Sequence, residues 1–156
     1  PKVRYESLLV CALLAFLLLS VSPASGDLGV GVIAGEPTGL SFKKWQEGGT
    51  AIDAATGWSF GKGGRFYVHA DYLWQRIVED REIGGSVPFY FGIGGRVLLH
   101  EDEDSRIGAR GPLGLDYFFD EGRFNVFVEV APILDVVPET ELALSAGLGL
   151  RYIFGR

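Results

Sequence analysis

Apolar and polar residues alternate with a period of two along the chain from Asp27 onward. No stretch there repeats the i, i+3, i+4, i+7 apolar spacing of an amphipathic helix, so the pattern favours strands throughout. Short segments rich in Gly, Pro, Asp and Glu separate the alternating stretches and supply the turns, and the longest connection is 77–86. The sequence therefore predicts an all-β domain of eight antiparallel strands at 28–34, 38–45, 51–60, 65–76, 87–99, 106–118, 123–134 and 141–154.

The two faces of these strands differ in composition. One face carries large apolar side chains, such as Phe124, Val126 and Val128 in the strand 123–134. The opposite face is rich in Gly, Ala and Ser and carries isolated charges, such as Glu129. A face exposed to water would be rich in Lys, Glu, Thr and Gln, whereas small residues with isolated charges suit the narrow interior of a membrane barrel. The pattern predicts an eight-stranded, antiparallel, up-and-down transmembrane β-barrel, which leaves no strand edge unpaired in lipid.

Residues 1–26 have the features of a signal peptide. Lys2 and Arg4 form a positively charged start, 8–19 is an unbroken apolar run, and small residues follow it. The run is too short for a membrane-spanning helix, because its residues rise only about 18 Å against a hydrocarbon core of about 30 Å. We expect a cleaved signal peptide at 1–26 and an outer-membrane barrel domain at 27–156. Together they predict export to the bacterial outer membrane.

Charge and cysteine content exclude some partners and bonds for the part of the chain after residue 26. Without 1–26 the chain has 12 basic and 19 acidic residues, which argues against a nucleic-acid partner because such proteins need a basic surface. The single cysteine, Cys11, lies within 1–26, so the rest of the chain forms no disulfide bond. We expect a monomer without cofactor or bound metal, whose partners are the lipids of the outer membrane.

Charged residues on the small-residue face are expected to form an ionic network inside the barrel. Burying a charge is costly unless an opposite charge lies beside it. Strand order suggests that Asp71 lies beside Arg96 and Arg110 beside Glu129, and we hypothesise that these two ion pairs form a plug that closes the lumen. The inward-facing charged set consists of Lys43, Asp53, Asp71, Arg96, Arg106, Arg110, Asp116, Glu129 and Arg151.

Aromatic residues near the strand ends are expected to form a girdle. Tyr and Trp prefer the level of the lipid headgroups, because they present an apolar body and a polar tip. This interpretation is favoured over a ligand-stacking set. The predicted girdle residues are Trp45, Trp58, Trp74, Tyr152 and Phe154.

Two clusters of polar residues invite a chemical interpretation. His69 and Asp71 share a strand face, and Ser59 on the preceding strand would complete a nucleophile-activating group. The chain contains no recognisable nucleophile motif, so a buried polar network is preferred and no catalytic residue is predicted. His100 and the acidic run 101–104 lack the glycine-turned spacing of a calcium loop, and no metal site is predicted there.

The last strand reads Leu148-Gly149-Leu150-Arg151-Tyr152-Ile153-Phe154, with apolar residues alternating up to a final aromatic. This motif resembles the C-terminal signal of the small eight-stranded outer-membrane barrels, the class of the transmembrane domain of outer-membrane protein A. The strand pattern of 28–154 is similar to that class, although Gly155 and Arg156 follow an aromatic that in many members is the final residue. The resemblance implies recognition by the barrel-assembly machinery during biogenesis. With a periplasmic N-terminus, the outward loops would be the short ones near 35–37, 61–64, 100–105 and 135–140.

The expected function is a structural role in the cell envelope, without a conducting pore and without enzymatic activity. An eight-stranded interior is filled by side chains, so solute flux is negligible. Two alternatives stay open at this point. One is a soluble periplasmic lipocalin-like barrel that binds an apolar ligand, which would need no detergent. The other is a lipid-modifying outer-membrane enzyme that uses His69, which lipid-turnover assays on His69→Ala would test.

Overall fold

The computed structural model describes residues 27–36, 38–59, 64–80, 85–100 and 105–155. These residues form one antiparallel sheet, which confirms the all-β, antiparallel prediction. None of them belongs to a helix long and apolar enough to cross a membrane. The segment 1–26, expected to be a signal peptide, lies outside the described residues. The strands are β1 (Leu28–Gly35), β2 (Gly39–Gln46), β3 (Thr50–Ser59), β4 (Arg65–Asp80), β5 (Gly85–His100), β6 (Arg106–Arg110), β7 (Leu113–Phe119), β8 (Phe124–Val137) and β9 (Glu141–Phe154).

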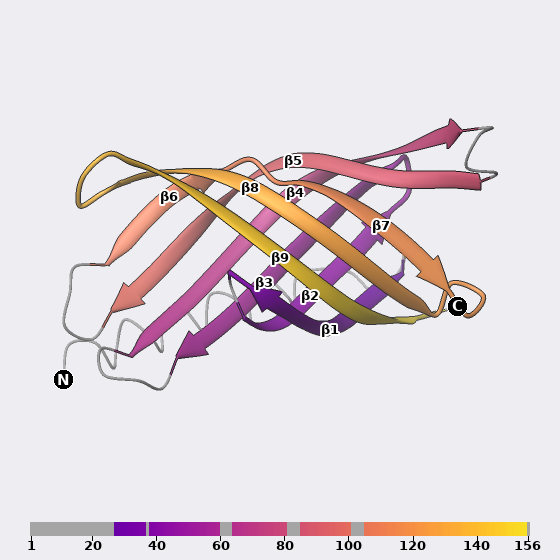
Figure 1. Cartoon of the computed structure of the whole chain (residues 1–156), viewed down its shortest axis with the longest axis horizontal. Coiled ribbons are helices and arrows are strands. Elements are labelled where there is room, and N and C mark those ends of the chain that lie inside the picture. Colours follow the sequence, from indigo (N-terminus) through magenta and orange to yellow (C-terminus); the bar gives the residue numbers. More distant parts are fainter. Residues whose placement is uncertain (1–26, 37, 60–63, 81–84, 101–104, 156) are drawn as a thin grey trace.

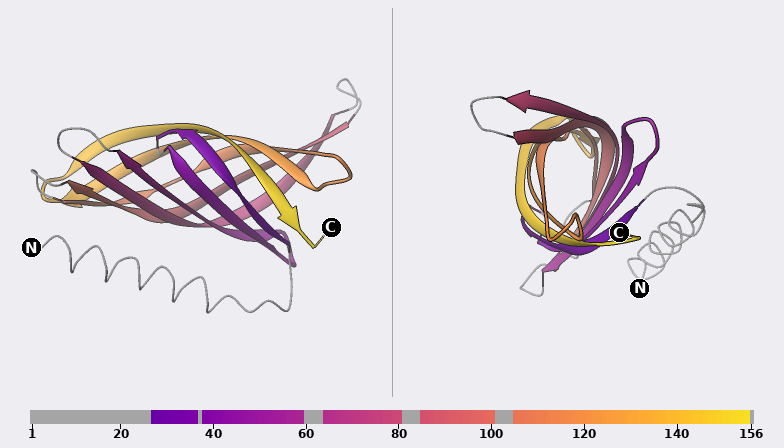
Figure 2. Two further views of the ribbon diagram at one scale, coloured as in Figure 1. Left: turned by 90° about the horizontal axis from the view of Figure 1, so that it is seen from below. Right: turned by 90° about the vertical axis from the view of Figure 1, so that its right-hand side faces the viewer.

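The sheet closes on itself as a ring (Figures 1 and 2). The strands pair antiparallel in chain order, with β6 and β7 both placed between β5 and β8, and β9 returns to pair with β1. This closing ladder runs from Leu28↔Phe154 to Gly35↔Gly147. Closure gives every strand two partners, so no main-chain edge runs the length of the barrel. The polar backbone groups of the ring are therefore satisfied within the sheet.

The structure contains nine strands among its described residues, not the eight predicted. The difference lies in the predicted strand 106–118, which is divided into β6 and β7 at Gly111 and Pro112. Proline has no N–H to donate to a ladder, so the strand is interrupted there. Both pieces pair with β5 and with β8, so together they occupy one position in the ring. The carbonyl of Pro112 still accepts a hydrogen bond from Gly92 N, at 3.0 Å.

The connection predicted at 77–86 is mostly strand. β4 continues to Asp80 and β5 begins at Gly85, and the two pair along their whole length as a hairpin. The β3 ladder ends at Trp74, so the last part of this hairpin projects beyond the ring (Figure 1). The sequence of this part, with its charged residues and glycines, shows no period-two alternation. The pattern alone therefore could not distinguish it from a loop.

Side chains divide sharply between the two faces of the ring. Large apolar side chains point outward and are exposed, for example Leu142 at 79%, Leu144 at 68% and Ile93 at 61%. The inside holds most of the buried charged groups together with a small apolar set. Ile33, Ala55 and Phe127 form one apolar cluster, and Ala51, Leu73 and Tyr90 form another. The molecule thus has the reverse of the usual arrangement in a water-soluble domain.

The two ends of the ring carry different connections. Asp27 and Gly155 lie at one end, with the β2–β3 and β7–β8 turns, and we call this the terminal end. The β1–β2, β3–β4, β5–β6 and β8–β9 connections lie at the opposite end, which we call the hairpin end (Figure 1). The expected outward loops all fall at the hairpin end.

Candidate functional site in the barrel interior

The interior of the ring is the most unusual chemical environment of the protein. Its buried polar groups come from all nine strands except β1, and they include charged side chains with almost no exposure. Eight of the nine charged residues expected to point inward are buried; Arg106 is half-exposed and pairs with Glu141 at the hairpin end, at 3.5 Å. The buried polar residues are Ser41, Lys43, Asp53, His69, Asp71, Arg96, His100, Arg110, Asp116, Asn125, Glu129, Asp135, Ser145 and Arg151.

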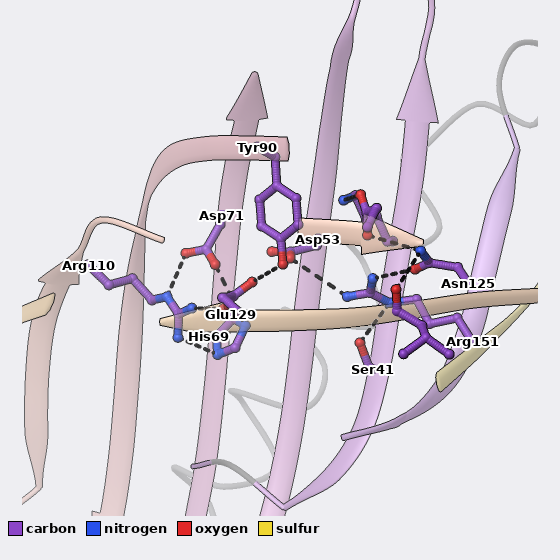
Figure 3. Close-up of polar contacts among 12 residues, drawn as sticks. Ser41, Asp53, His69, Asp71, Tyr90, Arg110, Asn125, Glu129 and Arg151 are labelled. Atoms are coloured by element: carbon purple, nitrogen blue, oxygen red, sulfur yellow. Dashed lines mark hydrogen bonds and ion pairs between the residues drawn. The ribbon is translucent and has the colours of Figure 1, made fainter. Parts of the chain in front are cut away.

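Arg110 is the centre of the middle layer (Figure 3). Its Nε lies 3.0 Å from Oδ1 of Asp71, and its Nη2 donates a short hydrogen bond to Oε1 of Glu129. Its Nη1 lies 2.8 Å from Nδ1 of His69 and 3.1 Å from the hydroxyl of Tyr67. Tyr90 donates to the other oxygen of Glu129 at 2.7 Å. One guanidinium thus joins β4, β6 and β8 across the lumen.

Arg151 is the centre of a second layer, nearer the terminal end. Its Nε donates to the hydroxyl of Ser41 at 2.9 Å and its Nη1 to the amide oxygen of Asn125 at 3.1 Å. Its guanidinium also stacks over the ring of Phe127 at 3.6 Å from the ring centroid. Its Nη2 lies 3.9 Å from Oδ2 of Asp53, which links this layer to the middle one (Figure 3).

Lys43 is held beside the second layer. Its Nζ donates to Oδ2 of Asp116 at 2.8 Å, and both side chains are fully buried. Asn125 donates to the other oxygen of Asp116 at 3.0 Å. The ammonium also lies 3.9 Å from the centroid of the Tyr90 ring, a favourable position for a cation. The pair is therefore neutralised, hydrogen-bonded and shielded from water.

Arg96 forms a separate ion pair towards the hairpin end. Its Nε and Nη2 donate to the two oxygens of Asp135, at 3.0 and 2.5 Å. This bidentate geometry is the strongest form of an arginine–carboxylate contact. The predicted pair Asp71–Arg96 is therefore wrong: Asp71 lies with Arg110, and Arg96 lies with Asp135. The predicted pair Arg110–Glu129 is present.

Strand register explains the partners of Asp71 and Arg96, because both contacts pass over a glycine. Asp71 and Arg110 are both opposite Gly94 on the strand between them. Arg96 and Asp135 are likewise both opposite Gly108. With no side chain on the middle strand, the charged groups of its two neighbours can meet above it.

The same rule holds elsewhere in the ring. Tyr90 and Glu129 meet over Gly114, and Ser41 and Arg151 meet over Gly31. A Cβ atom on Gly94 would clash with Oδ1 of Asp71, and one on Gly114 with the ring of Tyr90. The glycines of the small-residue face therefore leave the room that these polar side chains occupy. The glycines are visible in the sequence, but which charges they bring together depends on the register of three strands.

Asp53, His69 and Asp71 are close enough to suggest a metal site, with one ligand atom of each within 4.8 Å of the others. Arg110 argues against that interpretation. A guanidinium only donates, so Nδ1 of His69 accepts its hydrogen bond and the ring proton is on Nε2, 3.6 Å from Asp71. Neither ring nitrogen then offers a free lone pair, and a cation would also lie beside the positive charge of Arg110.

The fold does not bring together the residues of the other candidate catalytic group. Ala55, not Ser59, lies opposite His69 in the β3–β4 register, so the imagined nucleophile is not beside the imidazole. His69 is only 3% exposed. His100 is buried and its Nδ1 has no hydrogen-bond partner among the described residues, while the acidic run 101–104 lies outside them.

The predicted girdle residues divide between the two faces. Trp58, Tyr152 and Phe154 are exposed on the outside, and Trp74 stacks on Phe91 with ring centroids 5.7 Å apart. The prediction that Trp45 belongs to the outer girdle is wrong. It packs inside the ring against the cluster that contains Tyr90, and Lys43 lies 5.0 Å from its ring. In β2 it shares the inward face with Ser41 and Lys43, which strand alternation explains.

Replacing one glycine under an ion pair should cost more stability than replacing its neighbour. Gly94→Ala places a Cβ against Asp71 and should lower the free energy of unfolding by about 1–3 kcal/mol, because the site has no room. Gly95→Ala is the matched control, since its Cβ points away from the interior and meets only Gly108 O, at 3.5 Å. Urea unfolding in detergent measures both. Equal effects would show that the glycine does not make the space for the pair.

Arg110 and Glu129 should behave as a coupled pair in a double-mutant cycle. Arg110→Ala should lower the free energy of unfolding by about 3–5 kcal/mol, because it leaves buried carboxylates unpaired. The double change Arg110→Ala with Glu129→Ala should cost less than the sum of the single changes. Additivity of the two single effects would show that these side chains do not meet.

The chain was compared with models of protein families, with curated proteins and with solved structures. None of the three comparisons gives a significant match.

Proposed function

We propose that this chain is an integral barrel of the bacterial outer membrane with a structural role in the envelope and no conducting pore. The observation that carries the proposal is the reversal of its two faces. Large apolar side chains cover the outside of the ring, whereas charged side chains are buried inside it. A membrane barrel has this arrangement because lipid surrounds it and its interior is polar.

The exterior supports a lipid environment more than an aqueous one. Exposed apolar side chains occur on every strand of the ring, and they include Val32, Ile107 and Leu148, at 47–57% exposure. Water-soluble monomers rarely expose more than a few hundred Å² of contiguous apolar surface. A surface of this kind that surrounds the whole molecule is hard to reconcile with the lipocalin-like alternative, whose outer face must be wetted.

Aromatic contacts at the terminal end support the same proposal. Tyr117, Phe119, Phe124, Tyr152 and Phe154 form a chain of ring contacts across β7, β8 and β9, with centroids 5.0–6.3 Å apart. On β4 and β5, Trp74 and Phe91 continue this aromatic band. Such a band is typical of the level at which a barrel meets the lipid headgroups. We call these residues the terminal-end girdle.

The filled interior supports a structural role over transport, ligand binding or catalysis. Arg96, Arg110 and Arg151 occupy successive levels of the lumen and are joined to carboxylates at each level. An apolar ligand would have to displace these paired charges, which disfavours lipocalin-like binding. His69 is enclosed by Arg110 and Tyr67, so an enzymatic role for it has no support in the geometry.

The purified protein should behave as a closed membrane barrel. It should need detergent, insert into lipid vesicles with a β-type circular dichroism spectrum, and migrate differently on an SDS gel before and after boiling. The physical reason is that a closed ring has no edge from which to unzip. Quantitative recovery in an aqueous periplasmic fraction without detergent would contradict the proposal.

A charge on the outer face should be tolerated at the rim and rejected at the middle. Val128→Arg, at the fifth of the fourteen residues of β8 and so away from its ends, should destabilise the vesicle-inserted protein by about 2–4 kcal/mol, whereas Val137→Arg at the end of β8 should cost about 0–1 kcal/mol. Both valines are similarly exposed, at 46% and 44%. In water both changes would be nearly silent. Unfolding titrations in vesicles measure the two, and equal tolerance would contradict the assignment of the outer face to lipid.

A further inference from the structure

The wall of the barrel is shorter at the β1–β2 hairpin than at the strands on either side. The β1–β9 ladder stops at Gly35↔Gly147, although β9 begins at Glu141. On the other side, the β2–β3 ladder starts at Gly39↔Gly57, although β3 continues to Ser59. In Figure 2 (left) the indigo β1–β2 hairpin ends short of the other hairpins at its end of the molecule. The wall therefore has a notch at this point, bordered by β9 and β3.

A pocket of about 400 Å³ lies inside the notch. Glu36 and Thr38 of the hairpin form its sill, and Arg65, Tyr67 and Arg96 of β4 and β5 line it behind the sill. Tyr67 and Arg96 are buried, at 8% and 7% exposure, whereas Arg65 is exposed. The pocket therefore combines a buried aromatic and a buried cation with a second cation at the mouth.

The two arginines bring positive charge to the pocket. Arg96 uses Nε and Nη2 for Asp135 and also contacts Tyr67, which lines the pocket beside it. The side chain of Arg65 has no ion-pair or hydrogen-bond partner in the part of the chain that the structure describes. Guanidinium groups recognise phosphate oxygens with parallel N–H donors, and Glu36, the acidic residue in the lining, is exposed on the sill where solvent screens it.

An apolar groove of about 550 Å³ runs down the outer wall below the same hairpin. Its outward-facing side chains include Val32, Ala34, Leu148 and Leu150. Thr38 borders both this groove and the pocket behind the sill, so the two lie side by side at the notch. The groove is part of the apolar outer surface that we assign to lipid. An apolar groove beside a cationic pocket suits an occupant with an apolar tail and an anionic head.

We propose that the notch binds an acyl lipid with an anionic phosphate headgroup. The phosphate lies between Arg65 and Arg96, and an acyl chain lies in the groove along β1 and β9. This site rests on the proposed membrane location, and it adds a specific ligand to a barrel that is otherwise closed. The lipid enters from the side through the notch and leaves the paired charges of the lumen undisturbed.

Native mass spectrometry of the detergent-solubilised protein tests the site. The protein is titrated with dimyristoyl phosphatidylglycerol and, separately, with phosphatidylcholine that has the same chains. The anionic lipid should bind roughly fivefold more tightly, since only it presents an uncompensated phosphate. Arg65→Gln should abolish this preference, and Ala34→Phe, which fills the groove, should weaken the binding of both lipids.

Two matched variants serve as controls. Arg76→Gln removes an exposed arginine from the opposite end of β4, and Ala70→Phe enlarges an outward alanine away from the groove; both should bind like the wild type. Equal binding of the two lipids, or full retention by Arg65→Gln, would overturn the site. The site would also be overturned if the protein bound inorganic phosphate equally well with and without Ala34→Phe and showed no preference between the two lipids.

The outcome is separable from that of the membrane proposal. Failure of the protein to insert into vesicles would remove the membrane location itself. Normal insertion together with no lipid preference would remove only the notch site.

Discussion

The structure depends on pairing the charges that are buried inside the ring. A lone carboxylate or guanidinium in such a place costs several kcal/mol, and pairing repays this only when the geometry is close and hydrogen-bonded. The interior meets this condition in layers. Arg110 contacts Asp71, Glu129, His69 and Tyr67, while Arg96 contacts Asp135 through two donors. The Asp71–Arg110 and Arg96–Asp135 pairs join strands that are not neighbours in the sheet, so the network braces the ring beyond its ladders.

Glycine makes this pairing possible. Side chains on alternate strands of a closed sheet meet only if the strand between them is bare at that level. Gly94, Gly108 and Gly114 lie at these crossing points, and added Cβ atoms there would meet the very groups that are paired. The glycine content usually counts against a strand, because glycine packs nothing and costs conformational entropy. Here a charged group from the next strand fills the space that a side chain on the glycine would have taken.

The outside of the ring and the notch follow from different constraints. The outward apolar residues need only be apolar, so many substitutions among Val, Leu, Ile and Phe satisfy them. The notch, in contrast, comes from unequal strand lengths: the β1–β2 hairpin ends early while β9 and β3 continue. It leaves a cationic pocket and an apolar groove side by side at Thr38. A structural barrel with a lateral lipid site needs no opening through its lumen, which agrees with the filled interior.

The period of two along the chain by itself determined the all-β architecture, most of the strand positions and most of the inward charges, although Asp135 was missed. This is because alternation is a local property that each strand carries in its own residues. The sequence also contained Gly111 and Pro112, but only the ladder with β5 and β8 decided that they divide one strand into β6 and β7. The partner of Arg96 was decided by tertiary structure, because it depends on the register of three strands and on which residue of the middle one lacks a side chain. Trp45 shows the same limit: its place near a strand end suggested an interfacial girdle, yet its side of the strand directs it towards Tyr90 and Lys43 inside the ring.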